Sequence, residues 1–212
     1  MLLKRLVNIA LTAVAFSAFS LTAQAAQAKA ALESARERMK TIAQDKTSLE
    51  NKQAAMRKLQ RELLDFAYVS EQTLGENWAK LSPKQKKDFA AALEQLVEAS
   101  YLGKMRDADT ADIEFGEEQT TAEGTEVHAT ATAQGSEIHL VFKLKAKPQG
   151  GWLVTDVVID DVSLVRNYKA QFQKTLAKAS IAELQAKLQK KATELKNTPN
   201  TTATNELKTK QL

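Results

Sequence analysis

Few residues in this 212-residue chain are of the types that carry out chemistry, and their spacing assembles no recognisable reactive site. Cysteine is absent, which excludes disulfides, thiol nucleophiles, thiolate metal sites and a lipid-modified cysteine. The two histidines, His128 and His139, fall on the outward side of a predicted hairpin. A metal held by this pair would lack carboxylate or thiolate ligands at suitable spacing. We therefore interpret both as exposed strand histidines and predict no metal site.

Carboxylates and aromatic hydroxyls offer no stronger case for catalysis. Asp156 could supply a general base to a pocket, whereas Asp160 and Asp161 precede an apolar helical pattern and are better explained as a helix N-cap. Tyr101 and Tyr168 are single aromatics on amphipathic segments, which is typical of core residues. No phosphate-binding glycine loop and no serine elbow occurs. The sequence predicts no catalytic residue and no cofactor.

Charge and composition point away from nucleic acid. Lys and Arg number 30 against 26 Asp and Glu, so the net charge is +4, and the two signs are interspersed. Basic runs such as 187–191 lie on the polar sides of predicted helices and not beside stacking aromatics, which a nucleic-acid surface needs.

The first 25 residues read as a cleaved secretory signal peptide. Lys4 and Arg5 precede an apolar stretch over 6–21, and Ala23-Gln24-Ala25 forms an A-x-A cleavage site. The rival interpretation is a transmembrane anchor, but the apolar stretch is too short to span a bilayer comfortably. We predict cleavage after Ala25, with cleavage after Ala28 as second choice, and a periplasmic location in a Gram-negative cell.

Two kinds of periodicity divide the rest of the chain. Residues 30–101 have helical spacing, and Ser82-Pro83-Lys84-Gln85 is a strong helix start. A short strand at 113–115, a hairpin over 124–147 and a strand over 152–159 follow, and then helices over 162–176 and from 181 onward. Residues 197–212 are rich in Asn and Thr, and we predict that they are disordered. The order predicts an α+β fold with an antiparallel four-stranded sheet covered on one face by helices.

The predicted hairpin has one apolar face with small residues in it. Val127, Ala129 and Ala131 alternate on one strand and are matched by Ile138, Leu140 and Phe142 on the other. Alanine is unusual where a close-packed sheet would carry Val or Ile. The alanines either admit a bulky neighbour or leave room.

Two segments carry a resemblance to a known family. Residues 74–105, "LGENWAKLSPKQKKDFAAALEQLVEASYLGKM", resemble the pattern G-x-x-W…S/T-P-x-Q-x-x-x-F of the MlaC family of periplasmic phospholipid-binding proteins. Residues 152–172, "WLVTDVVIDDVSLVRNYKAQF", resemble that family's W-x-V-x-D-V-x-I-E-G-V-S-L-V-x-N-Y-R-x-Q-F. Asp161 stands where the pattern has Gly, and Lys169 where it has Arg.

The resemblance implies a lipid carrier built over residues 26–196, with a curved sheet in a nuclear-transport-factor-like cone around an apolar cavity. It implies a phospholipid ligand, an MCE-domain subunit of an inner-membrane ABC transporter and an outer-membrane lipoprotein complex as partners, and we expect a monomer. The residues expected to line the cavity are Trp78, Phe89, Leu93, Val97, Tyr101, Val127, Ala129, Leu140, Phe142, Val157, Ile159, Val165, Tyr168 and Phe172.

Two other functions remain open on sequence alone. An enzyme on a ketosteroid-isomerase-like sheet would need an inward carboxylate such as Asp156 with a raised pKa. A protein-binding or chaperone module would instead have a fully packed interior, with neighbouring side chains filling the space beside Ala129 and Ala131.

Overall fold

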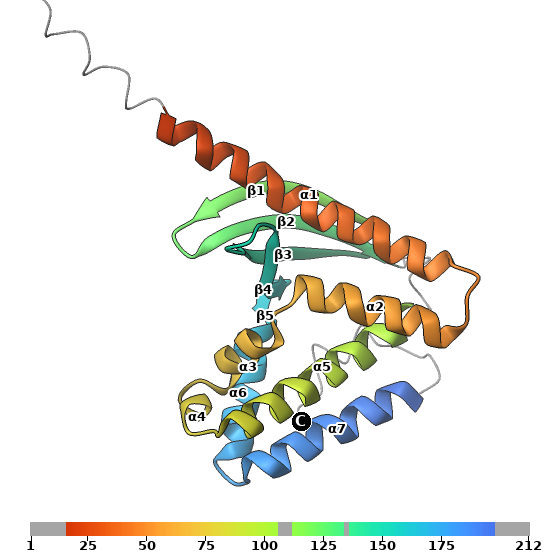
Figure 1. Cartoon of the computed structure of the whole chain (residues 1–212), viewed down its shortest axis with the longest axis vertical. Coiled ribbons are helices and arrows are strands. Elements are labelled where there is room, and N and C mark those ends of the chain that lie inside the picture. Colours follow the sequence, from red (N-terminus) through yellow and green to blue (C-terminus); the bar gives the residue numbers. More distant parts are fainter. Residues whose placement is uncertain (1–15, 106–111, 134–135, 198–212) are drawn as a thin grey trace, which may run out of the picture.

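The computed structural model describes residues 16–105, 112–133 and 136–197, which form an α+β fold (Figure 1). The helices are α1 (Phe16–Gln44), α2 (Leu49–Leu63), α3 (Phe66–Leu74), α4 (Glu76–Ala79), α5 (Pro83–Met105), α6 (Leu164–Leu176) and α7 (Ile181–Asn197). The strands are β1 (Asp112–Thr121), β2 (Gly124–Ala133), β3 (Ser136–Ala146), β4 (Trp152–Ile159) and β5 (Val162–Ser163).

The strands form one antiparallel sheet in the order β1-β2-β3-β4-β5. The register of the predicted hairpin is confirmed: Val127 lies opposite Phe142, Ala129 opposite Leu140 and Ala131 opposite Ile138. Phe142 in turn lies opposite Val157 and Leu140 opposite Ile159. Because residues in register share a face of the sheet, these side chains lie on one side, which we call the inner face.

Helix α1 covers the inner face. It runs across β1 and β2 at the top of Figure 1. Ala28 and Leu32 of α1 pack against Val127, Leu144 and neighbouring residues of the sheet. Lys29 and Arg36 hold the same helix to β1, through the Gly116 carbonyl at 3.0 Å and through the Asp112 carboxylate. The sheet and α1 thus share one apolar cluster.

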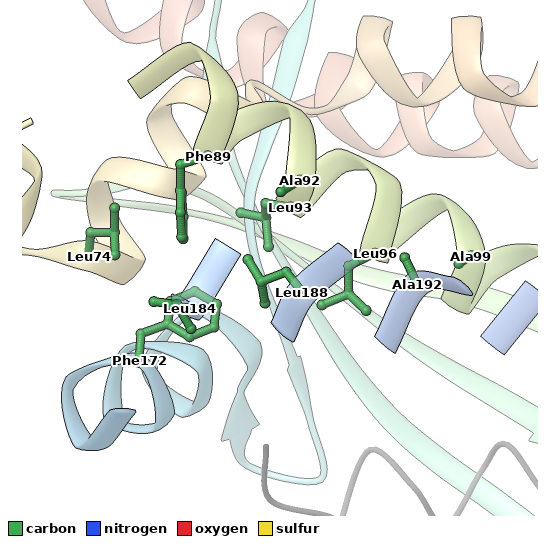
Figure 2. Packing of buried hydrophobic residues seen from close by; sticks show 10 residues of the cluster. All are labelled: Leu74, Phe89, Ala92, Leu93, Leu96, Ala99, Phe172, Leu184, Leu188 and Ala192. Atoms are coloured by element: carbon green, nitrogen blue, oxygen red, sulfur yellow. The ribbon is translucent and has the colours of Figure 1, made fainter. Parts of the chain in front are cut away.

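A second apolar cluster lies among the helices, and Figure 2 shows it between α5, α6 and α7. Phe89 and Phe172 meet edge to face with ring centroids 5.7 Å apart, and both are fully buried. Leu184 and Leu188 of α7 pack into the same cluster, as does Leu74 from α3. This helical layer lies at the opposite end of the molecule from α1 (Figure 1).

Helix α2 lies between these two parts and carries a third cluster. Met56 and Leu59 pack with Ala35 of α1. Toward α5 the contacts are ionic: Arg57 reaches Glu98 at 2.7 Å and Arg61 reaches Glu94 at 2.5 Å. Hydrogen bonding to Glu98 raises the pKa of Arg57. The described residues therefore form three separate apolar clusters, whereas one contiguous core is usual for a domain of this size.

The α+β prediction is confirmed, but the count of four strands is wrong by one. Asp160 and Asp161 both have positive φ, 43° and 67°, and form a tight turn from which Val162 and Ser163 pair back onto β4 as β5. They are therefore not the N-cap of a helix, and α6 begins two residues later than predicted. Its N-cap is Ser163, whose hydroxyl accepts the Arg166 amide.

Other boundaries bear on the predicted processing of the chain. Helix α1 begins at Phe16, within the predicted signal peptide, and continues through the predicted cleavage site. No helix in the described ranges is long and apolar enough to cross a membrane. The predicted disordered tail, apart from Asn197 at the end of α7, falls outside the described residues. The nuclear-transport-factor-like cone stays a prediction.

Candidate functional site

The inner face, on which α1 packs at β1 and β2, carries large apolar side chains on β3 and β4 that are half-buried. Leu140 and Phe142 of β3 and Val157 and Ile159 of β4 form two cross-strand pairs, and all four are half-buried. We call these four residues the inner strip. Phe142 also meets Phe115 of β1 with ring centroids 5.9 Å apart. Because these four side chains are only half-buried, the protein's own residues cover this apolar surface only in part.

Small residues flank the inner strip on β2. Ala129 lies opposite both Leu140 and Phe115, and Ala131 lies opposite Ile138. Both alanines are buried. The alanine methyl groups extend only a short way from the sheet, and Ala129 lies between the larger side chains of Phe115 and Leu140. The register thus places the smallest side chains of the face beside its half-buried large ones.

The sequence-predicted site residues divide between the sheet and the helical cluster. Val127, Phe142 and Val157 belong to the cluster that the sheet shares with α1. Phe89, Leu93, Trp78, Tyr168 and Phe172 belong to the helical cluster. Phe89, Leu93 and Phe172 are at most 1% exposed, so their surfaces are already in contact with protein. Their role in ligand contact stays a prediction.

Tyr168 links the helical cluster to α6. Its ring lies 5.6 Å from that of Phe172. Burial raises the pKa of the Tyr168 phenol, which holds the group neutral well above neutral pH. A neutral, partly buried phenol that packs on the helical cluster is typical of a core residue, and its role in lining a cavity stays a prediction.

Ala129, Leu140 and Ile159 belong to none of the three clusters, and neither do two predicted residues on the helices. Val97 of α5 and Val165 of α6 are half-buried, like the inner strip. Tyr101 belongs to α5, but its side chain lies outside the described residues.

Asp156 is on the outer face and has a structural role. It lies opposite Lys143, and Lys143 forms an ion pair with Glu126 at 2.9 Å. One carboxylate oxygen accepts the amides of Val157 and Val165, at 2.9 and 3.0 Å, and the other accepts the Ser163 hydroxyl. These bonds fix the start of α6. Asp156 therefore does not supply the inward carboxylate for which the enzyme hypothesis named it as a candidate.

The histidines also lie on the outer face and are both exposed. His128 lies opposite Val141 and His139 lies opposite Thr130, so the two are diagonal neighbours. Within the described ranges, no group of three His, Cys, Asp or Glu side chains could hold a metal ion.

The predicted cavity lining left out two residues of the inner face. Ile113 lies opposite Ala131, and both Ile113 and Ile138 are half-buried. The alternation had already placed Ile138 on the apolar face of the hairpin, and the same pattern would have identified Ile113. Met56 and Leu59 of α2 were missed as well, because their pattern shows an amphipathic helix but not which surface it covers.

The chain also matches the model of a known protein family. The MlaC family model, described as "MlaC protein", matches residues 31–190, most of the chain. The chain belongs to the MlaC family. This confirms the resemblance found in residues 74–105 and 152–172. The matched range includes all five strands and the described helices α2 to α6 entire.

A solved structure resembles this MlaC-family chain over most of its length. It is the phospholipid-binding protein from Ralstonia solanacearum in complex with a phospholipid, with a TM-score of 0.69 and 21% sequence identity. The alignment covers 80% of this chain and 98% of the other. The likeness shows a shared fold. Comparison with curated protein sequences gives no match.

Proposed function

We propose that this MlaC-family chain is a soluble periplasmic phospholipid carrier that holds acyl chains against the inner face. The half-buried inner strip is the observation that carries the proposal, because it offers apolar surface on the same face as the cluster shared with α1. The Ralstonia protein of the same fold, in complex with a phospholipid, supports it. The ligand would lie beside Leu140, Phe142, Val157 and Ile159.

The energetics fit a carrier that uses apolar contact alone. Two acyl chains contain about 30 methylenes, and at roughly 0.8 kcal/mol each they cost on the order of 20 kcal/mol to expose to water. A carrier must approach the bilayer's own stabilisation of the chains without greatly exceeding it, since it must also release them. An apolar wall does this without hydrogen bonds to the tails, and a headgroup left in water implies little headgroup selectivity.

The same proposal assigns a location and partners. The signal peptide would direct the chain to the periplasm, where a monomer would collect lipid at an outer-membrane lipoprotein complex. It would deliver that lipid to an MCE-domain subunit of an inner-membrane ABC transporter, or carry lipid the other way. The contacts would be transient, with dissociation constants in the range of about 1 μM, because a shuttle must leave each site.

The proposed reaction is transfer without chemical change. Asp156, the carboxylate named as a candidate for the enzyme hypothesis, holds the start of α6 from the outer face. We propose no catalytic residue and no cofactor.

A pair of neighbouring substitutions tests the binding surface. Leu140→Asp places a carboxylate on the inner face, whereas Val141→Asp places it on the outer face at an equally half-buried position one residue away. We expect Leu140→Asp to lose phospholipid from the purified protein and Val141→Asp to retain it, measured by lipid extraction and mass spectrometry. Thermal unfolding of both variants shows whether each is folded. Equal lipid content in two folded variants would contradict the assignment of the faces.

A transfer assay tests the carrier function. Lipid-loaded protein is mixed with an MCE-domain subunit without ATP, and the phospholipid on each protein is measured after separation. We expect intact phospholipid to move in at least one direction. Appearance of lysophospholipid or free fatty acid would support an enzyme instead.

A further inference from the structure

Glu118 is a charged side chain on the covered inner face. It lies opposite Val127, whose side chain is fully buried beneath α1. One of its carboxylate oxygens, Oε2, accepts the backbone amide of Lys29 at 3.0 Å. The other, Oε1, is buried and has no hydrogen-bond partner among the described residues. A buried carboxylate oxygen without a donor is costly, so Glu118 is only half satisfied.

The ammonium group of Lys29 does not supply the missing donor. Its Nζ donates instead to the carbonyl of Gly116 at 3.0 Å. The ion pairs of α1 that the described residues form lie farther along the helix, at Arg36, Arg38 and Lys40. These side chains therefore leave Oε1 without a partner, and a further donor near the Lys29 amide would satisfy it.

The bond from the Lys29 amide is itself typical of a helix start. Inside an α-helix each amide hydrogen points along the axis to the carbonyl four residues back, and only the first four amides lack that acceptor. Capping side chains accept from the second or third residue after the N-cap. If a helix began with Ala26 as N-cap, Lys29 would be that third residue.

We propose that removal of residues 1–25 creates a new N-terminus at Ala26 that docks on Glu118. Signal peptidase hydrolyses the Ala25–Ala26 amide with one water, which leaves a carboxylate on Ala25 and an amine, protonated at neutral pH, on Ala26. The Ala26 ammonium donates to Oε1 while the Lys29 amide keeps Oε2. This inference rests on the signal peptide of the proposed function.

The reach and the charges suit this contact. Three residues of helix rise about 4.5 Å, so the Ala26 nitrogen lies one helical turn from the Lys29 amide that already touches the carboxylate. The ammonium offers three donors, and a carboxylate at a helix N-terminus is stabilised by the exposed amides there. Glu118 thus serves as the N-cap side chain that alanine cannot provide.

Burial of Ala28 favours the first of the two predicted cleavage sites, because only cleavage after Ala25 leaves Ala28 in the mature chain. Ala28 is fully buried and packs in the cluster with Val127, Leu144 and Trp152. Cleavage after Ala28 would remove this side chain from the core, whereas cleavage after Ala25 keeps it. Processing at Ala25 completes the contact between α1 and the sheet.

The test uses the full-length chain, secreted with its own signal peptide and purified from the periplasm. Intact mass identifies the N-terminus, which we expect to be Ala26. The rate at which a succinimidyl ester acylates the α-amine at neutral pH is then followed on the N-terminal peptide by mass spectrometry. We expect Glu118→Gln to increase this rate severalfold, because the amine loses its carboxylate partner. Glu117→Gln, at the exposed neighbouring position, should leave the rate unchanged.

A second measurement separates docking from general loosening of the fold. Inserting Gly-Ser between Ala25 and Ala26 preserves the cleavage motif but moves the ammonium away from Glu118. The insertion and Glu118→Gln should each lower the melting temperature, and the double variant should lose little more than either alone. Additive losses, an unchanged acylation rate in Glu118→Gln, or a mature chain starting at Lys29 or Met1 would each overturn the proposal. Phospholipid content of the same preparations tests the carrier function separately.

Discussion

At the residue scale, Asp156 and Ser163 together determine where the sheet ends and α6 begins. Ser163 donates its hydroxyl to Asp156 and accepts the Arg166 amide at 3.0 Å, while Asp156 accepts the Val165 amide. Two of the first amides of α6 are thereby satisfied. Ser163 is only 3% exposed, so water cannot replace its hydroxyl.

Replacing Ser163 should therefore cost more than replacing an exposed cap. We expect Ser163→Ala to lower the free energy of unfolding by about 1–2 kcal/mol, measured by urea denaturation. The control is Ser180→Ala, because Ser180 is an exposed residue whose hydroxyl accepts the Glu183 amide at 3.2 Å. A larger loss in Ser180→Ala would show that burial of the Ser163 network does not matter.

Single residues also show where the sequence misleads. Asp is favoured both at helix N-caps and in turns with positive φ, so Asp160 and Asp161 fit either structure. The family pattern has glycine where Asp161 stands, and glycine favours the left-handed conformation that Asp161 adopts at φ 67°. The glycine in the family pattern was therefore the signal from which the turn could have been predicted. Glu118 gave no such signal, because nothing local tells which helix will cover it.

At the element scale, two ion pairs of unequal burial join α2 to α5. The Glu98 side chain is 6% exposed and its partner Arg57 is 40% exposed. The Glu94 side chain is 15% exposed and its partner Arg61 is 62% exposed. The first pair should matter more, because loss of Arg57 leaves a buried carboxylate alone, whereas water can reach the second pair.

We expect Arg57→Met to lower the free energy of unfolding by about 1–3 kcal/mol, a range reduced because the Arg57 side chain is partly exposed. Arg61→Met should cost less than about 1 kcal/mol. The double variant Arg57→Met, Glu98→Leu should be more stable than Arg57→Met alone, since it removes the stranded charge. Denaturant unfolding of the three variants measures these free energies of unfolding. A double variant less stable than the single one would contradict the account.

Elements with strong local signals were predictable from sequence. The Ser82–Gln85 capping box is confirmed, with the Ser82 amide donating to the Gln85 side chain at 2.9 Å and the Gln85 amide to Ser82 Oγ at 3.3 Å. The hairpin register followed from the alternation on both sides of the predicted turn at 134–136. How the helices cover the sheet did not, because an amphipathic pattern gives the apolar side of a helix but not its partner. For that reason the sequence could group Leu140 with Ile159 but not foresee that Phe89 and Phe172 form a separate cluster.

At the scale of the whole molecule, the fold carries its apolar residues in three clusters with half-buried surface on the inner face. The fold class and the family were predictable from sequence. The division of the core was not, because it depends on contacts between segments far apart in the chain, such as α1 with β2 and α5 with α7.

The segment after α7 should be dispensable at this scale. Deleting residues 198–212 leaves α7 complete to Asn197 and removes a stretch without apolar periodicity. We expect the melting temperature and the phospholipid content to stay unchanged, measured by thermal unfolding and lipid extraction. A fall of several degrees would show that this segment docks on the domain.

Native mass spectrometry of the protein purified from the periplasm tests the central claim most directly. We predict that the folded protein carries a mass increment that dissociates on collisional activation as intact phospholipid. We also predict that Leu140→Asp loses this increment while Val141→Asp keeps it. A folded wild-type protein that shows only the mass of its own chain, or that releases lysophospholipid or fatty acid, would contradict the carrier account.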